Sequence, residues 1–323
     1  MKPEVIIVTP SVIPPEYMAR FNEHFSIRHC PTDESQKKAM ESDWVKDVRG
    51  VFTSGSVGIK PELLKKMPNV EIVCCKGTGF DALDMDELRR LGVFVTHGAG
   101  ANAPSVADHA FALMLSTMRQ IPKLDDAVRQ GKWASSRNLQ PILWRKRLGL
   151  LGFGKIGREI AKRALAFDMT VSYHARNKRD DVSFTYYATP LELAKNSDIL
   201  VVCTPGGAET KKLINRAMLD ALGPQGYLVN VARGSVVDTQ ELIAALKEGR
   251  IAGAGIDVVE GEPEIPAQLF DVPNLVMTPH IGGRSPEASD MTLDLVIENL
   301  QAHFAGKPVL TPVPGSAGRR RAA

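Results

Sequence analysis

The sequence has few of the features that mark membrane, disulfide-rich or nucleic-acid-binding proteins. No apolar run approaches the length that a membrane-spanning helix needs. Only four cysteines occur among 323 residues, and none has the C-x-x-C spacing of a metal or redox motif. The net charge is only +3, and the one run of arginines, Arg319–Arg321, follows a Pro- and Gly-containing segment near the end of the chain. These absences argue against a membrane, a metal ion or a nucleic acid as a partner.

What the sequence does contain is typical of a large globular protein. Hydrophobic residues make up 44% of the chain, and its length suggests about two domains. The opening segment MKPEVIIVTP has an apolar run too short for a signal peptide. Cys74 and Cys75 lie in an apolar, strand-like run, which predicts buried free thiols in a reducing compartment. We therefore expect a cytoplasmic protein.

The second part of the chain alternates apolar strands with helices. Strands are predicted at 148–152, 170–174, 198–203, 227–232, 252–257 and 275–279, with helices at 155–167, 190–196, 211–222 and 238–249. Continuously apolar strands alternating with helices indicate a parallel sheet that is covered on both faces. The pattern predicts an α/β fold with a doubly wound, Rossmann-like parallel sheet in this region.

The first hundred residues repeat the pattern on a smaller scale. Strands are predicted at 4–9, 50–55, 70–75 and 93–98, with helices near 14–24, 60–67 and 84–91. An apolar helix from Pro104 leads into the second region, and a helix at 286–305 is expected to return to the first. We therefore predict a discontinuous, smaller, flavodoxin-like substrate domain (1–101 and 287–323) and a dinucleotide-binding domain (102–286). The long connection at 123–146, which carries two tryptophans, is a candidate oligomer contact.

A G-x-G-x-x-G motif at Gly152, Gly154 and Gly157 lies between a predicted strand and a predicted helix. In that context it is typical of a turn that binds the pyrophosphate of a dinucleotide, whereas an ordinary glycine-rich turn is the alternative. The helix that follows would offer free N–H groups to the phosphates. The cofactor contacts expected at this turn and at neighbouring strand ends are Gly152, Phe153, Gly154, Lys155, Ile156, Gly157, Thr204, Pro205, Val231 and Gly282, with Val106 from the preceding helix.

The strand after the glycine motif ends without a carboxylate. A NAD-binding fold usually places an Asp or Glu there for the ribose 2′-hydroxyl, but this strand is followed by Arg176 and Asn177, and the first acids are Asp180 and Asp181. An arginine can bind a 2′-phosphate with two parallel hydrogen bonds. This pattern predicts NADP(H) rather than NAD(H), with a solvated basic loop as the alternative.

Polar residues gather at the predicted carboxyl ends of the remaining strands, where open parallel sheets bind ligands. They are Arg233, Asp257, His280 and the glutamates Glu260, Glu262 and Glu264. Each has an ordinary alternative role, as a loop arginine, a turn-capping acid or a structural histidine. Together they fit hydride transfer to a 2-keto acid: Arg233 would bind the substrate carboxylate, His280 would protonate the developing alkoxide, and a neighbouring carboxylate would orient the imidazole. The residues alone do not choose among the three glutamates.

Five motifs resemble those of the D-isomer-specific 2-hydroxyacid dehydrogenases: KGTGFDALD, LGLLGFGKIG, VNVARGSVVD, AGAGIDVVEGEP and NLVMTPHIGG. The resemblance implies that Arg233, Glu262 and His280 form the catalytic trio and that Asp257 holds the nicotinamide carboxamide. It further implies a homodimer, and substrate contacts from the N–H groups of Thr78 and Gly79. Ser56, at the edge of the first predicted sheet, is a further candidate substrate contact.

Within this family the SYHAR segment looks like the NADPH-preferring glyoxylate/hydroxypyruvate reductases, including the 2-ketogluconate reductase type. The expected product is an (R)-2-hydroxy acid. Formate dehydrogenases of the superfamily carry Gln where Glu262 stands, so that activity is disfavoured. The alternatives are a NAD-dependent D-2-hydroxyacid or phosphoglycerate-type dehydrogenase, and a dinucleotide-sensing corepressor that binds partner proteins.

Overall fold

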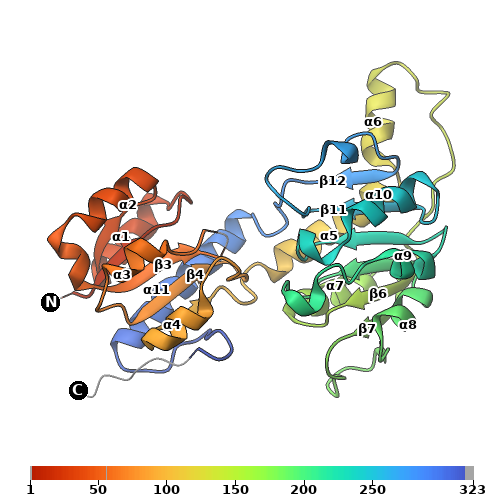
Figure 1. Cartoon of the computed structure of the whole chain (residues 1–323). Coiled ribbons are helices and arrows are strands. Elements are labelled where there is room, and N and C mark those ends of the chain that lie inside the picture. The colour runs from red at the N-terminus through yellow and green to blue at the C-terminus, as the bar shows by residue number, and fades with distance from the viewer. Residues whose placement is uncertain (1, 56, 317–323) are drawn as a thin grey trace. The chain divides into compact units, whose positions relative to one another are not determined.

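The computed structural model describes residues 2–55 and 57–316, and the chain forms two compact units (Figure 1). Unit 1 consists of Met1–Asn102 and Pro286–Ala323, and unit 2 is Ala103–Ser285. Unit 1 is therefore built from both ends of the chain, and unit 2 is inserted into it. Each unit contains its own parallel β-sheet.

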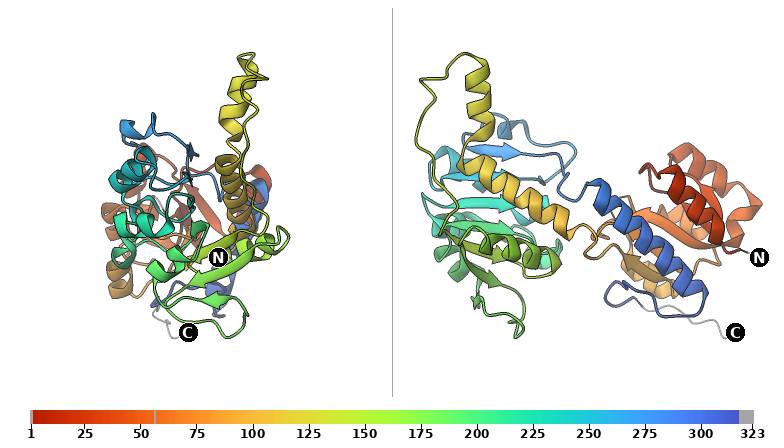
Figure 2. Two further views of the ribbon diagram at one scale, coloured as in Figure 1. Left: turned by 90° about the vertical axis from the view of Figure 1, so that its right-hand side faces the viewer. Right: turned by 180° about the vertical axis from the view of Figure 1, so that it is seen from behind.

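Unit 1 has a five-stranded sheet in the order β2-β1-β3-β4-β5, which is the flavodoxin-like order. Its strands are β1 (Glu4–Ile7), β2 (Ser26–His29), β3 (Val48–Ser54), β4 (Ile72–Lys76) and β5 (Phe94–His97). Its helices are α1 (Pro15–His24), α2 (Asp33–Met40), α3 (Pro61–Lys65), α4 (Met85–Leu91) and α11 (Pro286–Phe304). Helix α11 crosses one face of this sheet, as Figure 2 shows from behind, and packs with α1 on the side chains of Val5 and Ile7. Ile6 and Val8 point to the opposite face and pack with α2, α3 and α4.

Unit 2 has a seven-stranded sheet in the order β12-β11-β10-β9-β6-β7-β8. Its strands are β6 (Arg147–Leu151), β7 (Thr170–His174), β8 (Thr185–Tyr186), β9 (Ile199–Val202), β10 (Tyr227–Asn230), β11 (Gly253–Ile256) and β12 (Leu275–Met277). Its helices are α5 (Ala103–Met118), α6 (Ile121–Arg129), α7 (Lys155–Leu165), α8 (Pro190–Lys195), α9 (Arg216–Leu222) and α10 (Thr239–Lys247). The strand order reverses between β6 and β9, so the doubly wound sheet has its ligand-binding switch point there.

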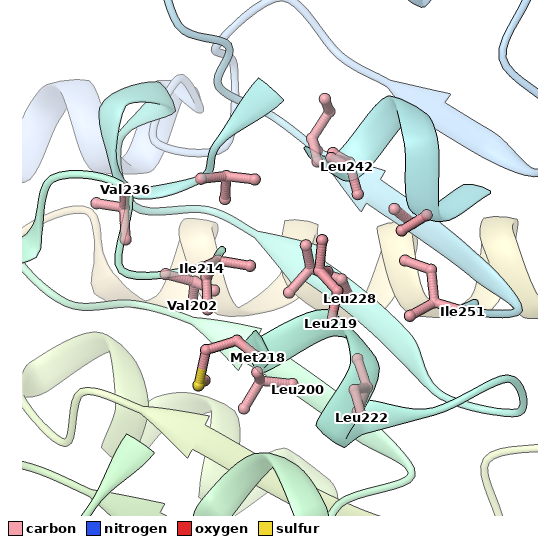
Figure 3. Close-up of a cluster of buried hydrophobic side chains, with 14 of the residues drawn as sticks. Leu200, Val202, Ile214, Met218, Leu219, Leu222, Leu228, Val236, Leu242 and Ile251 are labelled. Carbon is pink, nitrogen blue, oxygen red and sulfur yellow. The ribbon is translucent and has the colours of Figure 1, made fainter. Parts of the chain in front are cut away.

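The strands of unit 2 are apolar throughout because both of their faces are buried. In β9, Leu200 and Val202 pack with α8, α9 and α10 in the core shown in Figure 3. Ile199 and Val201 point to the other face and pack with α5 and α7. Because side chains alternate between the two faces of a strand, one apolar segment contributes to the cores on both sides of the sheet. The predicted fold class, an α/β protein with two Rossmann-like parallel sheets, is confirmed.

Several elements differ from the sequence-based expectation. Strands β2 and β8 and helices α2 and α6 were not predicted. β2 and β8 are edge strands with partly exposed side chains, α2 is polar, and α6 has no buried residue. None of the four has the run of buried apolar side chains by which the other elements were predicted. The predicted helix at 211–222 begins only at Arg216, because Asn215 caps the Met218 N–H and Ile214 forms a parallel bridge with Val237.

The four cysteines are free thiols, as predicted. Cys30, Cys74 and Cys75 are buried. Burial raises the pKa of the Cys74, Cys75 and Cys203 thiols to about 12. Within residues 2–55 and 57–316, no helix has the length and apolarity to cross a membrane, and no group of three or more His, Cys, Asp or Glu side chains is placed to hold a metal ion.

Candidate active site

The glycine turn lies at the switch point of the sheet in unit 2, directly after β6. Gly152 has a φ of 104°, a conformation that favours glycine, and Cys203 at the end of β9 donates a hydrogen bond from Sγ to the Gly152 carbonyl at 3.0 Å. A Cβ on Gly157 would lie 2.7 Å from the same carbonyl oxygen. The first and third glycines are therefore required by a positive φ and by close packing of α7 on the turn.

The second glycine leaves space for a ligand. Gly154 is the N-cap of α7, and a Cβ built on it would meet nothing within 4 Å. No side chain caps the helix at this position, so its first N–H groups point into that space. This arrangement fits the pyrophosphate of a dinucleotide. Phe153, Val106 and Val231 are at most 8% exposed, so they would meet a cofactor mainly through backbone atoms.

The end of β7 exposes the two residues predicted to distinguish the cofactors. Arg176 and Asn177 are exposed, and within the described part of the chain the Arg176 guanidinium has no hydrogen-bond or ion-pair partner. The basic side chain of Arg158 is instead paired with Asp181 at 2.9 Å and lies over the Phe153 ring. Arg176, which directly follows the end of β7, is therefore available to a ligand, as is the exposed side chain of Arg179 further along the same loop.

Asp257 is buried directly after β11, and it holds the turn at residues 278–282 that follows β12. Its Oδ1 accepts hydrogen bonds from Thr278 Oγ1 at 2.6 Å and from the Ile281 N–H at 2.9 Å, and its Oδ2 accepts from the Gly282 N–H at 2.8 Å. His109 Nε2 lies 3.2 Å from Oδ1. Burial alone would raise the pKa of Asp257, but these hydrogen bonds outweigh it and hold the pKa below its ordinary value.

His280 and Glu262 form a hydrogen-bonded pair. His280 Nδ1 lies 2.6 Å from Glu262 Oε1, and the other carboxylate oxygen accepts from the Val259 N–H at 3.3 Å. The His280 N–H donates to the Asp257 carbonyl at 2.8 Å. Both side chains remain partly open to solvent, at 47% for His280 and 35% for Glu262. Because Nδ1 faces a carboxylate, Nε2 is the ring nitrogen left to meet a substrate.

Arg233 follows β10 and lies beside the loop that carries Glu262. The Arg233 carbonyl accepts a hydrogen bond from Asn230 Nδ2 at 3.1 Å. The Arg233 guanidinium donates to the Ala232 carbonyl at 2.7 Å. A Cβ on Gly234 would lie 2.1 Å from the Val259 carbonyl carbon, so only glycine allows these two backbone segments to meet. The structure thus brings the backbone next to Arg233 against the loop that carries Glu262.

The predicted substrate contacts Thr78 and Gly79 belong to unit 1, in the loop after β4. Thr78 Oγ1 donates to Asn102 Oδ1 at 2.8 Å, and the Thr78 carbonyl lies 2.7 Å from His97 Nδ1. Their backbone N–H groups donate to no other residue in the described part of the chain. Ser56, the third predicted substrate contact, lies outside the described residues.

Comparison with known proteins decides the family. Residues 111–282 match the family described as D-isomer specific 2-hydroxyacid dehydrogenase, NAD binding domain. A 2-ketogluconate reductase from Gluconobacter oxydans is 37% identical over 97% of this chain and 99% of its own length. A hydroxyphenylpyruvate reductase from Plectranthus scutellarioides is 44% identical over 82% of this chain and 85% of its own length. The chain belongs to the D-isomer specific 2-hydroxyacid dehydrogenase family.

Solved structures agree with this membership. An NADPH-dependent glyoxylate/hydroxypyruvate reductase from Sinorhizobium meliloti, crystallised with NADP and malonate, matches with a TM-score of 0.89 and 37% identity over 100% of both chains. A 2-hydroxyacid dehydrogenase from Ketogulonicigenium vulgare matches with a TM-score of 0.87 and 33% identity over 97% of this chain and 98% of its own. As a D-2-hydroxyacid dehydrogenase, the protein is an oxidoreductase with a nicotinamide dinucleotide cofactor.

In this D-2-hydroxyacid dehydrogenase, sequence reasoning missed three residues of the site. Ser105, His109 and Thr278 hold Asp257 and the His280 turn through side-chain hydrogen bonds. Ser105 and His109 lie in an apolar helix, where a polar residue is easily interpreted as structural. Their four-residue spacing, which places both on one face of α5, was the available signal.

Proposed function

We propose that this protein reduces small 2-keto acids such as glyoxylate, hydroxypyruvate or 2-ketogluconate to (R)-2-hydroxy acids, with NADPH as the preferred reductant. The observation that carries the proposal is the His280–Glu262 pair, 2.6 Å apart, on a turn held by Asp257 in the dinucleotide-binding fold. A 2-ketogluconate reductase and a glyoxylate reductase, relatives that match nearly the whole chain, support the same substrate class.

In this proposal His280 is the proton donor. The Glu262 carboxylate accepts from Nδ1 and fixes the plane of the ring, so that Nε2–H is presented to the carbonyl oxygen of the substrate. When bound, a reduced nicotinamide would supply the hydride for the carbonyl carbon. The proton from Nε2 then balances the negative charge that develops on the oxygen, and the His280–Glu262 pair is left with one proton fewer.

The proposed substrate-binding groups are cationic or backbone donors. Arg233 carries a permanent planar charge that suits the carboxylate next to the keto group. The N–H groups of Thr78 and Gly79, which donate to no described residue, are further donors for that carboxylate. A carboxylate accepts several hydrogen bonds at once, so donors of both kinds can serve it.

The preference for NADPH is proposed from the end of β7. Asp257 and the glycine turn suit either dinucleotide, whereas Arg176 is the feature suited to a 2′-phosphate. Its guanidinium is exposed and lacks a partner among the described residues, and no carboxylate precedes Asp180 in this loop. A carboxylate at this place would repel a 2′-phosphate, whereas an arginine binds it with charge-assisted hydrogen bonds.

The direct test is a matrix of initial rates with NADPH and NADH against glyoxylate, hydroxypyruvate, pyruvate and 2-ketogluconate. We expect turnover with at least one of these acids, and a higher kcat/KM with NADPH. Dinucleotide binding without turnover on any acid would overturn the proposed reaction and favour a dinucleotide-sensing role. A higher kcat/KM with NADH would overturn the cofactor preference alone.

The 2′-phosphate contact is tested with Arg176→Ala. Hydrogen bonds to charged groups contribute about 1.5–3 kcal/mol, so the KM for NADPH should rise about tenfold or more while that for NADH changes little. Lys178→Ala, at an exposed basic residue of the same loop, is the matched control. Equal losses with both dinucleotides would mean that the phosphate is bound elsewhere.

We also propose a homodimer that uses the segment after α5. Helix α6 has no buried residue, and it projects away from the sheet of unit 2 in Figure 2. Large apolar side chains along this segment are exposed, including Ile121, Val128, Trp133, Leu139 and Ile142. Exposed large apolar side chains gathered on one segment of the chain favour an interface there. Light scattering should give the mass of a dimer, and Trp133→Ser with Leu139→Ser should give a monomer; a wild-type monomer would refute the proposal.

A further inference from the structure

Helix α5 holds the His280 turn at two points, one helical turn apart. Ser105 Oγ donates to the Gly282 carbonyl at 2.8 Å. Four residues later, His109 Nε2 lies 2.8 Å from Thr278 Oγ1 and 3.2 Å from Asp257 Oδ1. The two side chains share one face of the helix because residues four apart lie above one another. Both ends of the turn at 278–282 are therefore tied to α5.

The hydrogen-bond inventory assigns the proton of His109. A threonine hydroxyl has one hydrogen to donate, and Thr278 donates it to Asp257 Oδ1 at 2.6 Å. Thr278 Oγ1 must therefore accept from His109, so Nε2 of His109 carries a hydrogen. His109 and Thr278 together place two donors beside Oδ1. His109 is largely buried, with 16% of its side chain exposed, so water does not replace this contact easily.

Asp257 connects His109 to the proposed proton donor, His280, through its hydrogen bonds to the backbone of the turn. Its carboxylate accepts from the N–H groups of Ile281 and Gly282, and its carbonyl accepts from the His280 N–H. His280 itself has a φ of 52°, a left-handed conformation that a non-glycine residue keeps only when its surroundings hold it. The His280 N–H donates to the Asp257 carbonyl at 2.8 Å and to the Thr278 carbonyl at 3.0 Å, and the side chains of both of these residues are contacted by His109.

We infer that His109 is a positioning residue of the active site: its Nε2–H donor fixes Asp257 and Thr278, and through them the backbone that aims His280 at the substrate. The inference rests on the proposed function of His280, which His109 serves without touching the reacting atoms. Misplacement of a reacting group by about 1 Å can lower a rate roughly 100-fold. Loss of the donor should therefore lower kcat in enzyme that is still folded.

The test compares His109→Leu, which removes the donor, with His109→Gln, which keeps an N–H donor at a comparable reach. We expect kcat to fall roughly 10- to 100-fold in His109→Leu, with a small change in the KM for the keto acid, and to recover largely in His109→Gln. Asp108→Asn is the matched control, because this neighbour pairs with Arg163 at the surface of the same helix. It should keep the wild-type kcat.

A second measurement does not depend on turnover. Hydrogen exchange of the peptide that contains Ile281 and Gly282 should be about tenfold faster in His109→Leu than in wild type or Asp108→Asn. If His109→Leu does not fold, Thr278→Val removes the hydroxyl of the same network with little change in shape, and the same two effects are expected from it.

Three results would overturn the inference. They are a wild-type kcat in folded His109→Leu, equal damage in His109→Leu and His109→Gln, or unchanged exchange at Ile281 and Gly282. The proposed function fails separately, if His280→Ala keeps the wild-type turnover. An inactive His280→Ala beside a fully active His109→Leu would refute the positioning role alone.

Discussion

Replacing Glu262 by glutamine separates the charge of the His280–Glu262 pair from its geometry. Glutamine keeps an oxygen that can accept from His280 Nδ1, as the carboxylate does at 2.6 Å, and it can accept from the Val259 N–H as well. The negative charge that strengthens the hydrogen bond to the ring is lost. Alanine removes both the charge and the acceptor. The difference in kcat between Glu262→Gln and Glu262→Ala therefore measures how much the orientation of the His280 ring contributes.

The size of the charge effect follows from the exposure of the pair. A hydrogen bond to a charged group contributes about 1.5–3 kcal/mol and a neutral one about 0.5–1.5 kcal/mol, a difference of about 1–1.5 kcal/mol. Glu262 is 35% and His280 47% exposed, so solvent screening favours the lower end of that range. We expect kcat to fall about fivefold in Glu262→Gln, and about 100-fold in Glu262→Ala, where the general acid is no longer oriented.

The assay is kcat at saturating NADPH and keto acid, with the thermal midpoint measured on the same samples. Glu264→Gln is the matched control, since this neighbouring glutamate is exposed and its side chain has no hydrogen bond within the described residues. It should keep wild-type activity. A wild-type kcat in Glu262→Gln and Glu262→Ala would refute the pairing, and a loss confined to Glu264→Gln would show that the wrong glutamate was chosen.

Three further results are expected. Gly157→Ala places a Cβ 2.7 Å from the Gly152 carbonyl oxygen, so chemical denaturation should show a loss of about 1–3 kcal/mol and dinucleotide binding should weaken; unchanged stability would contradict the close packing. Because the pKa of Asp257 is lowered, its contribution to stability is complete above the ordinary range of aspartate and is lost as the pH falls through that lowered pKa. Urea unfolding should therefore show the stability gap between wild type and Asp257→Asn closing as the pH falls below about 4, whereas a constant gap would exclude this contribution. Burial raises the pKa of the Cys74 and Cys75 thiols to about 12, so neither should react with a disulfide reagent at pH 8 before unfolding; rapid reaction of these two thiols in the folded protein would contradict their burial.

The central strands were predictable because each carries apolar side chains on both faces. Ile199–Val202 is apolar at every position, and the two cores that it serves leave no other arrangement for such a segment. Edge strands lack that signal. Ser26–His29 is half exposed and polar, and its strand conformation comes from pairing with β1 rather than from its own composition. Helix α2 is likewise stabilised by the Thr32 cap and by the packing of Gln36 and Ala39, and its polar sequence does not predict that packing.

The site was predictable to the level of strand ends but not of loop conformation. Arg233, Asp257 and His280 follow successive strands, so their gathering at one edge follows from the parallel sheet. The choice of Glu262 from three nearby glutamates required the family resemblance, because the contact with His280 depends on how the loop from Val259 folds back. The role of His109 was hidden for a related reason: its partners Thr278 and Asp257 lie 169 and 148 residues away in sequence.

The discontinuity of unit 1 has a consequence for how the chain is made. The side chains of Val5, Ile7 and Phe52 pack on Leu293, Val296 and Leu300 of α11, which is synthesised only after the whole of unit 2. At roughly 5–20 residues per second, the N-terminal sheet waits for its covering helix on the order of tens of seconds. Unit 2 is complete before that helix emerges. The nascent chain therefore carries a finished dinucleotide-binding fold beside an uncovered apolar sheet face, which is the surface that a chaperone would need to shield.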